Sequence, residues 1–459
     1  ITNEGAGGEN YNTITYVAPS THERGTLWVG TDDGLVHVTR DEGDTWSDVT
    51  PDGIGEAQIN AIEVSPHDPG TAWVVATNYK FNDFTPHVFR TDDYGANWTR
   101  QVDGIGPDAW VRVVREDPVR RGLLFAGTEL GLYVSLDRGA TWRAFQRNLP
   151  VVPITDLTIR QGDLVAATQG RAFWVLDDLS PLRQLAESTV AAGMHLFEPA
   201  EAIQADFGGG FGGGGARSGQ NPPSGAQIFY SFAEAPEDLV TLEILGPDGA
   251  VVRTLATDPE AAGNDRFTEL PAPTAGLNRA SWDFRTESLP VVEGLVPFGS
   301  LQGRILPPGA YTVRLAHAGD TATAPLRVLP DPRRSATQAE YVAQDRFLAQ
   351  AQEAIRDLYR SVIDLQSVRE QVDAVIANTA DHPRADTVAA VGGALTERIT
   401  GWEDQVVQTR QRTFQDVINY LNQLDAQFLA LVGSVDGVEP PVTAGARTRL
   451  SDLSDEWAG

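Results

Sequence analysis

Three stretches of the chain share one sequence motif: residues 39–46 are TRDEGDTW, residues 91–98 are TDDYGANW, and residues 135–142 are SLDRGATW. We call these segments the box turns, and their common pattern is Ser/Thr-x-Asp-x-Gly-x-Thr/Asn-Trp. Their aspartates are 52 and 44 positions apart, which is the length of one four-stranded blade of a β-propeller. Three copies at this period predict a repeat of antiparallel blades.

The residue types of the box-turn motif have a physical reason. The Asp carboxylate can accept backbone N–H bonds within a tight turn, Gly takes the positive φ that the turn requires, and Trp fills the gap to the neighbouring sheet. We therefore predict structural roles for Asp41, Gly43, Trp46, Asp93, Gly95, Trp98, Asp137, Gly139 and Trp142. In this interpretation the repeated carboxylates form turns and are not catalytic acids.

Each box turn belongs to a longer unit of alternating strands. In each unit a second strand ends in a Gly/Ala-Thr-polar step, and a third strand leads into the box. A fourth unit keeps the first three strands but ends without the Gly and Trp. Residues 1–185 are thus expected to form four blades. We interpret them as part of a larger propeller, whose remaining blades lie elsewhere in the precursor or on another chain.

Hairpin parity predicts a ligand face. In an up-and-down blade, the loop between strands two and three lies on the face opposite the box turns. Polar residues recur in that loop at one level near the central channel, and these are our candidates for ligand contacts: Asp32, Asn78, Glu129, Gln169 and Arg171. The alternative is that the recurring threonines and their neighbours only satisfy hydrogen bonds at strand ends.

After residue 185 the pattern changes twice. Residues 186–226 contain a Gly-rich stretch at 208–215 and are expected to form a linker. Residues 227–332 alternate again in six or seven short strands, which predicts an Ig-like or fibronectin-like sandwich. From 335 to 459 the apolar period becomes three and four, which predicts an antiparallel helical bundle whose third helix includes Val417, Leu421 and Leu424. The fold class is therefore multidomain, mainly β and then α.

Composition excludes several functions. The net charge of −28 makes nucleic acid an unlikely partner, because phosphate binding needs a basic face. There is no cysteine, and the seven histidines form no His-x-x-x-His pair, so we predict no metal site and no cofactor. The pairs at 32–33 and 177–178 leave calcium open as an alternative. No apolar run approaches the roughly 20 residues that span a bilayer.

Beyond the box turns, four phrases carry a resemblance: ITNEGAGGEN at 1–10, WVGTDDGL at 28–35, REDPVRRG at 115–122 and FWVLDD at 173–178. The box turns match the Asp-box, or BNR repeat, of sialidases and sortilin-type propellers. The chain resembles the C-terminal part of long secreted bacterial proteins of this kind, which are often labelled glycosyl hydrolases. This resemblance implies an upstream signal peptide, further blades, and a secreted, periplasmic or cell-surface location.

No catalytic residue can be transferred from the sialidases. Their mechanism needs three arginines, a Tyr–Glu pair and an acid/base aspartate, and no equivalent blade positions carry that set here. The first functional hypothesis is therefore a sortilin-like scaffold that binds a protein, peptide or glycan. The alternative is a sialidase-like glycoside hydrolase that uses carboxylates such as Asp32 and Glu129 at the channel. A purely structural component of a cell-surface assembly is a third hypothesis.

Overall fold

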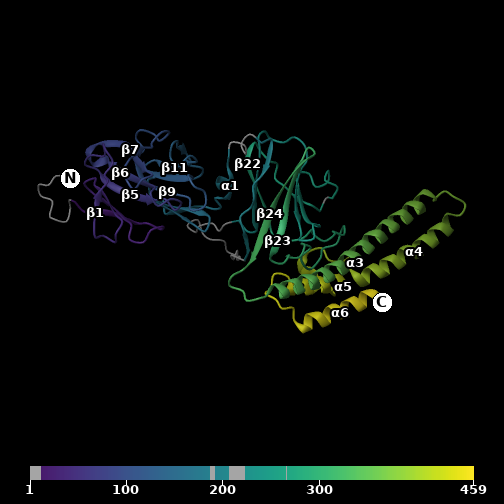
Figure 1. Cartoon of the computed structure of the whole chain (residues 1–459). Helices are drawn as coiled ribbons and strands as arrows, with labels where there is room; N and C mark the ends of the chain where they lie inside the picture. The colour runs from purple at the N-terminus through teal and green to yellow at the C-terminus, as the bar shows by residue number, and fades with distance from the viewer. Residues whose placement is uncertain (1–11, 187–191, 206–222, 265) are drawn as a thin grey trace. The chain divides into compact units, whose positions relative to one another are not determined.

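The computed structural model describes residues 12–186, 192–205, 223–264 and 266–459 (Figure 1). The chain divides into two compact units, Ile1–Leu185 and Ala186–Gly459. The first ten residues and the Gly-rich stretch at 208–215 lie outside the described residues.

The first unit contains four antiparallel sheets, each with its strands in sequence order. The first sheet is β1 (Ile14–Pro19), β2 (Leu27–Thr31), β3 (Val36–Thr39) and β4 (Ser47–Asp48). The second is β5 (Gln58–Val64), β6 (Ala72–Asn78), β7 (Asp83–Thr91) and β8 (Thr99–Arg100), with the 3-10 turn η1 (Tyr79–Phe81) between β6 and β7. The third is β9 (Val111–Glu116), β10 (Leu124–Thr128), β11 (Gly131–Ser135) and β12 (Arg143–Ala144). The fourth has three strands, β13 (Ile154–Arg160), β14 (Asp163–Thr168) and β15 (Phe173–Leu176).

Consecutive sheets pack face to face with their first strands adjacent. The Thr15 hydroxyl on β1 donates to the carbonyl of Ile59 on β5, and the Arg115 Nε on β9 donates to the carbonyl of Leu157 on β13, both at 2.8 Å. All five residues of β10 are buried because sheets cover both of its faces. This is the up-and-down, propeller-like arrangement that the repeat predicts. The short helix α1 (Ser180–Gln184) follows the fourth sheet.

Two further sheets share one hydrophobic core in the second unit. The smaller has the order β16 (Met194–Leu196), β18 (Ala226–Phe232) and β22 (Gly276–Trp282). The larger has the order β17 (Ala202–Gln204), β24 (Asp320–Pro330), β23 (Gly309–His317), β19 (Val240–Leu245), β20 (Val251–Ala256) and β21 (Thr268–Glu269). Strands β16 and β17 lie within 186–226, the segment expected to be a linker. The Ig-like assignment stays a prediction.

The C-terminal region is helical: α3 (Gln338–Asn378), α4 (Ala385–Val406), the 3-10 helix η2 (Phe414–Ile418), α5 (Leu424–Val435) and α6 (Ala444–Ala458). Thr337 and Glu340 form a capping box that starts α3. The expected third helix begins only at Leu424. Leu421 lies outside any helix with 81% of its surface exposed, because the short η2, which a second capping box at Thr413 begins, ends at Ile418, before Leu421.

Among the described residues, no helix combines the length and apolar character needed to cross a bilayer.

Candidate functional site

The strand order sorts the loops of the first unit onto two faces. Each of its sheets is a meander, so the connections from strand one to two and from three to four lie on one face. The box turns lie on this face, and we call it the box face. The connections from strand two to three lie on the opposite face, which we call the ligand face.

The box turns bind their own aspartates. Asp41 accepts hydrogen bonds from the backbone N–H of Thr45 at 2.9 Å, from the Thr45 hydroxyl at 2.6 Å and from the Thr39 hydroxyl at 2.8 Å. These bonds, those from Thr45 above all, lower the pKa of Asp41 to about 2. Asp93 and Asp137 have the same three contacts in their own turns. Their carboxylates therefore have a structural use inside the turn.

The tryptophans of the second and third box turns attach each sheet to the one before it. The Trp98 Nε1 donates to the carbonyl of Val49 at 2.7 Å, and the Trp142 Nε1 donates to the carbonyl of Gln101 at 3.2 Å. Trp46, at the same position of the first box turn, has 44% of its surface exposed. Among the described residues, Trp46 therefore makes no packed contact like those of the other two tryptophans.

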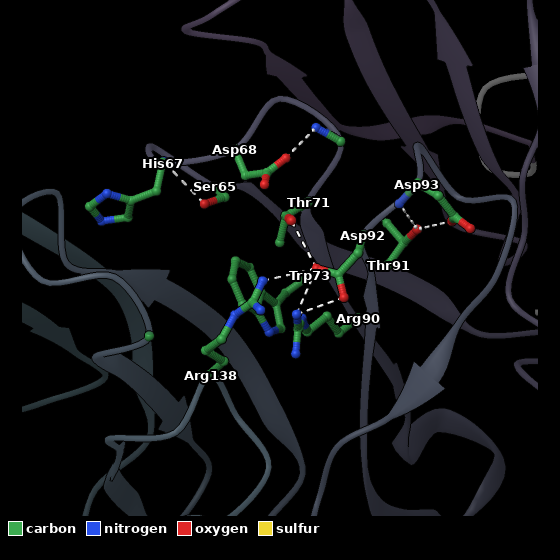
Figure 2. Close-up of polar contacts among 12 residues, drawn as sticks. Ser65, His67, Asp68, Thr71, Trp73, Arg90, Thr91, Asp92, Asp93 and Arg138 are labelled. Atoms are coloured by element: carbon green, nitrogen blue, oxygen red, sulfur yellow. Dashed lines mark hydrogen bonds and ion pairs between the residues drawn. The ribbon is translucent and has the colours of Figure 1, made fainter.

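Further polar groups on the box face are joined to one another (Figure 2). Asp92 accepts two bonds from the Arg90 Nη2 at 2.6 Å, one from the Thr71 hydroxyl at 2.9 Å, and one from the Arg138 Nη2 at 3.0 Å. Arg138 belongs to the third box turn, so this contact connects the third sheet to the second. The carboxylate of Asp92 is thus fully paired within the protein, whereas the Nε atoms of Arg90 and Arg138 are buried without a hydrogen-bond partner among the described residues.

The predicted residues on the ligand face lie at or directly after the ends of β2, β6, β10 and β14, and both carboxylates among them have partners. Asp32 Oδ1 accepts the backbone N–H of Thr13 at 2.8 Å. Glu129 forms an ion pair with Arg112 at 2.5 Å. These are the strand-end contacts that the alternative interpretation predicted.

The other candidates differ from these two carboxylates. The backbone N–H of Gln169 donates to the carbonyl of Pro153, and the Arg171 Nη1 donates to the carbonyl of Gly170. Asn78 Oδ1 is buried and has no hydrogen-bond partner among the described residues. Asn78 is therefore a candidate whose polar group remains unsatisfied within the chain.

An aromatic cluster on the same face was missed by the sequence analysis. Trp110, directly before β9, stacks on Tyr79 with ring centroids 5.6 Å apart and planes at 16°, and it contacts Phe84 at 5.3 Å. The Trp110 Nε1 is buried without a hydrogen-bond partner in the described part of the chain. The three rings come from two sheets, so no local pattern joins them. The available signal was that aromatic residues flank strand ends in both of these sheets.

Asp32 also contributes to a small pocket between the first two sheets, which is lined by Asp32, Asp33, Glu56, Gln58, Thr77, Tyr79, Lys80 and Phe81. Its cavity volume of about 20 Å³ matches one water molecule and not a sugar ring. Lys80 donates to the Gln58 side chain at 3.1 Å inside it. In the part of the chain that the structure describes, no three His, Asp or Glu side chains gather into a group that could hold a metal ion.

A second polar cluster joins the first strands of all four sheets. Arg115 on β9 contacts Glu63 on β5 at 3.3 Å, Asp156 on β13 at 2.8 Å, and the Tyr16 hydroxyl on β1 at 3.2 Å. Burial raises the pKa of Glu63 to about 7, against the attraction of Arg115. Asp156 is by contrast exposed. The guanidinium group of Arg115 thus brings a buried and an exposed carboxyl group close together.

No family model and no curated protein matches this chain. Solved structures match weakly. A structure of YCF48 bound to D1 peptide is 14% identical, with 68% of this chain and 82% of that chain covered and a TM-score of 0.29. The GH74 xyloglucanase from Xanthomonas campestris is 15% identical, with 73% and 48% covered and a TM-score of 0.30. PorZ from Porphyromonas gingivalis is 14% identical, with 69% and 45% covered and a TM-score of 0.29. The chain spans about half the length of the last two proteins.

Proposed function

We propose that the first unit is a sortilin-like binding module and that its ligand face takes up a protein, peptide or glycan. The observation that carries this proposal is the contrast between the paired carboxylates of the box face and the aromatic cluster of the ligand face. On the box face, the carboxylates of the three turns and of Asp92 bind partners within the protein. On the ligand face, Asn78 and Trp110 keep polar atoms without partners, beside the half-buried ring of Tyr79 and the exposed ring of Phe84.

This contrast favours binding for an energetic reason. A buried polar atom without a partner carries a desolvation penalty of roughly 1–3 kcal/mol, and a ligand that supplies the partner relieves it. Aromatic faces add contact area for sugar rings or for apolar side chains at small entropic cost. The rest of the chain would serve as the scaffold that presents this face. We also propose a secreted, periplasmic or cell-surface location, which rests on the sequence resemblance.

The test is a screen of the whole chain against an immobilised glycan array and a phage-displayed peptide library. We expect a ligand whose affinity falls at least tenfold when Tyr79 and Phe84 are both changed to Ala. Trp46→Ala is the matched control, because it removes an exposed aromatic ring from the box face. Binding that survives the double variant, or that Trp46→Ala abolishes, would refute the proposed face.

We further propose that the four sheets belong to a larger ring, completed by blades of the same precursor or of another chain. The support is the exposure of Trp46, at 44% of its surface, and of Phe173 on β15, at 77%, because each ring lies on one of the two outer sheets of the described residues. Native mass spectrometry of the particle isolated from its source tests this. A partner fragment with further box turns is expected, whereas a lone monomeric chain would contradict the larger ring.

A glycoside hydrolase remains the second candidate, favoured by the cluster around Arg115. Glu63, with a pKa near neutrality, has the property of a general acid, and Asp156 is a second, exposed carboxyl group that contacts the same arginine. Asp32 and Glu129, the carboxylates first suggested for this role, have structural partners instead. Release of reducing sugar from polysaccharides, lost in Glu63→Gln at unchanged melting temperature, would support the enzyme. Equal rates in Glu63→Gln and wild type would exclude it.

A further inference from the structure

The outer half of the α3/α4 hairpin, residues 363–398, is a helix pair without further cover. The fully buried residues of α3 end at Val362, and those of α4 are Ile399, Glu403 and Val406 near its C-terminal end. Figure 1 shows these halves of the two helices extending past α5 and α6. We call residues 363–398 the distal hairpin.

One side of the distal hairpin is an apolar groove with a cavity volume of about 550 Å³, lined mainly by Val368, Val372, Val375, Ile376, Val388, Val391 and Leu395. Val391 has 68% of its surface exposed and Val375 has 53%. The two helices approach closely at Gly392, where an added Cβ would lie 2.7 Å from the Cδ1 of Ile376. The apolar stripes of both helices therefore form one continuous surface.

Such a surface matches half of a four-helix bundle. Amphipathic helices bury their apolar stripe against other helices, and two antiparallel hairpins that face each other bury all four stripes in a common core. Contiguous apolar surface of this kind on a soluble protein marks an interaction site.

We propose that two copies of this chain pair through their distal hairpins, antiparallel and related by a two-fold axis, as a four-helix bundle. The charges at the two ends of the groove select a second copy in this orientation. Arg384 lines the groove one turn before Val388, and Asp364 lies one turn before Val368, on the same side of its own helix. Because the helices are antiparallel, these two charges lie at opposite ends of the groove.

A two-fold axis through the centre of the groove exchanges its ends. Arg384 of one copy then approaches Asp364 of the other, and the axis repeats this pair at the far end. Both side chains are exposed, and neither has an ion-pair partner within the described residues of its own chain. A parallel pairing would instead set Arg384 against Arg384. The groove is thus complementary in charge to its own two-fold image.

The experiment is sedimentation velocity of the full chain at 1–100 µM in 0.3 M salt, where repulsion between copies with a net charge of −28 is screened. We expect a dimer whose dissociation constant rises at least 100-fold in Val391→Arg. Val119→Arg, at an equally exposed valine of the first unit, should leave it unchanged. A chain that stays monomeric at 100 µM would overturn the proposal, as would a dimer that Val391→Arg does not weaken.

Charge reversal tests the orientation independently. Arg384→Glu should weaken the dimer about tenfold, and Arg384→Glu combined with Asp364→Arg should restore it. Circular dichroism of each variant confirms that the helices are intact. If the double variant dimerised no more tightly than the single variant, the antiparallel pairing would be overturned. Selective loss in Val391→Arg also separates this contact from ring completion at the propeller sheets, which that variant leaves untouched.

Discussion

Asp425→Asn removes a carboxyl group whose ionisation opposes folding of the helical region. Asp425, in the first turn of α5, is 2% exposed. Its Oδ2 accepts the Tyr359 hydroxyl at 3.2 Å, and its Oδ1 is buried without a hydrogen-bond partner in the described residues. Burial raises the pKa of Asp425 from 3.8 to about 6. The folded state therefore holds this proton more tightly than the unfolded state does.

The sign of the pH dependence follows from this difference. Below pH 3.8 the group is protonated in both states and costs nothing. As the pH rises to about 6, the unfolded chain loses the proton first, so the free energy of unfolding falls. The interval between the two pKa values corresponds to about 3 kcal/mol, all of it lost above pH 7. Asparagine cannot ionise, but its amide leaves one buried group unpaired at about 1–2 kcal/mol. We expect Asp425→Asn to be more stable than wild type by about 1–2 kcal/mol at pH 8.

The assay is urea unfolding followed by circular dichroism at 222 nm, which reports mainly on the helices. Stability of the wild type should fall between pH 4 and pH 7, and the curve of Asp425→Asn should be flatter. Asp373→Asn, an exposed site on α3, is the matched control and should follow the wild type. Parallel curves for Asp425→Asn and wild type would show that this carboxyl does not carry the penalty we assign to it.

Two further predictions concern the box turns, and both compare a position that packs against the preceding sheet with the equivalent position of the first box turn. Gly95→Ala should destabilise the first unit by about 2–4 kcal/mol, because the new Cβ would meet Val49 at 2.6 Å, whereas Gly43→Ala should cost only the backbone strain of about 1 kcal/mol. Calorimetric melting of both variants measures this, and equal losses would contradict the packing argument. Trp142→Ala should cost about 3–5 kcal/mol because the ring is 3% exposed, and Trp46→Ala less than about 1 kcal/mol. Urea unfolding monitored by β-sheet circular dichroism decides this, and a large loss in Trp46→Ala would show that its interface is already occupied.

Local chemistry is the part of this fold that the sequence makes predictable. A box turn depends on contacts between residues four positions apart, such as Asp41 with Thr45, so its sequence motif indicates its geometry. Hairpin parity then assigns each loop to a face without any knowledge of distances. The helical region shows where periodicity fails. Leu421 continues the apolar pattern, but it lies between the short η2, which begins at the capping box of Thr413, and the start of α5.

Contacts between sheets were not predictable in the same way. Arg115 reaches Tyr16, Glu63 and Asp156, which are 99, 52 and 41 residues away in the sequence. Trp110 likewise stacks on a ring from another sheet. Such contacts depend on how closely the first strands approach one another, which no single strand encodes. The level of the ligand-face residues could therefore be predicted, but not which of them would have a partner.

In the proposed binding module, the two faces of the first unit have different roles. The box face holds the sheets together, and the opposite face provides the binding surface. Groups on the box face bind each other, as the bonds from Thr71, Arg90 and Arg138 to Asp92 illustrate, so a ligand there would have to replace internal bonds and would gain little. On the ligand face, Trp110 is held in place by stacking while its N–H remains unsatisfied. The exposed ring of Phe84, which contacts Trp110, offers a ligand contact area without first breaking an internal hydrogen bond. The box turns thus favour binding indirectly, because they fix the sheets that hold the opposite face in position.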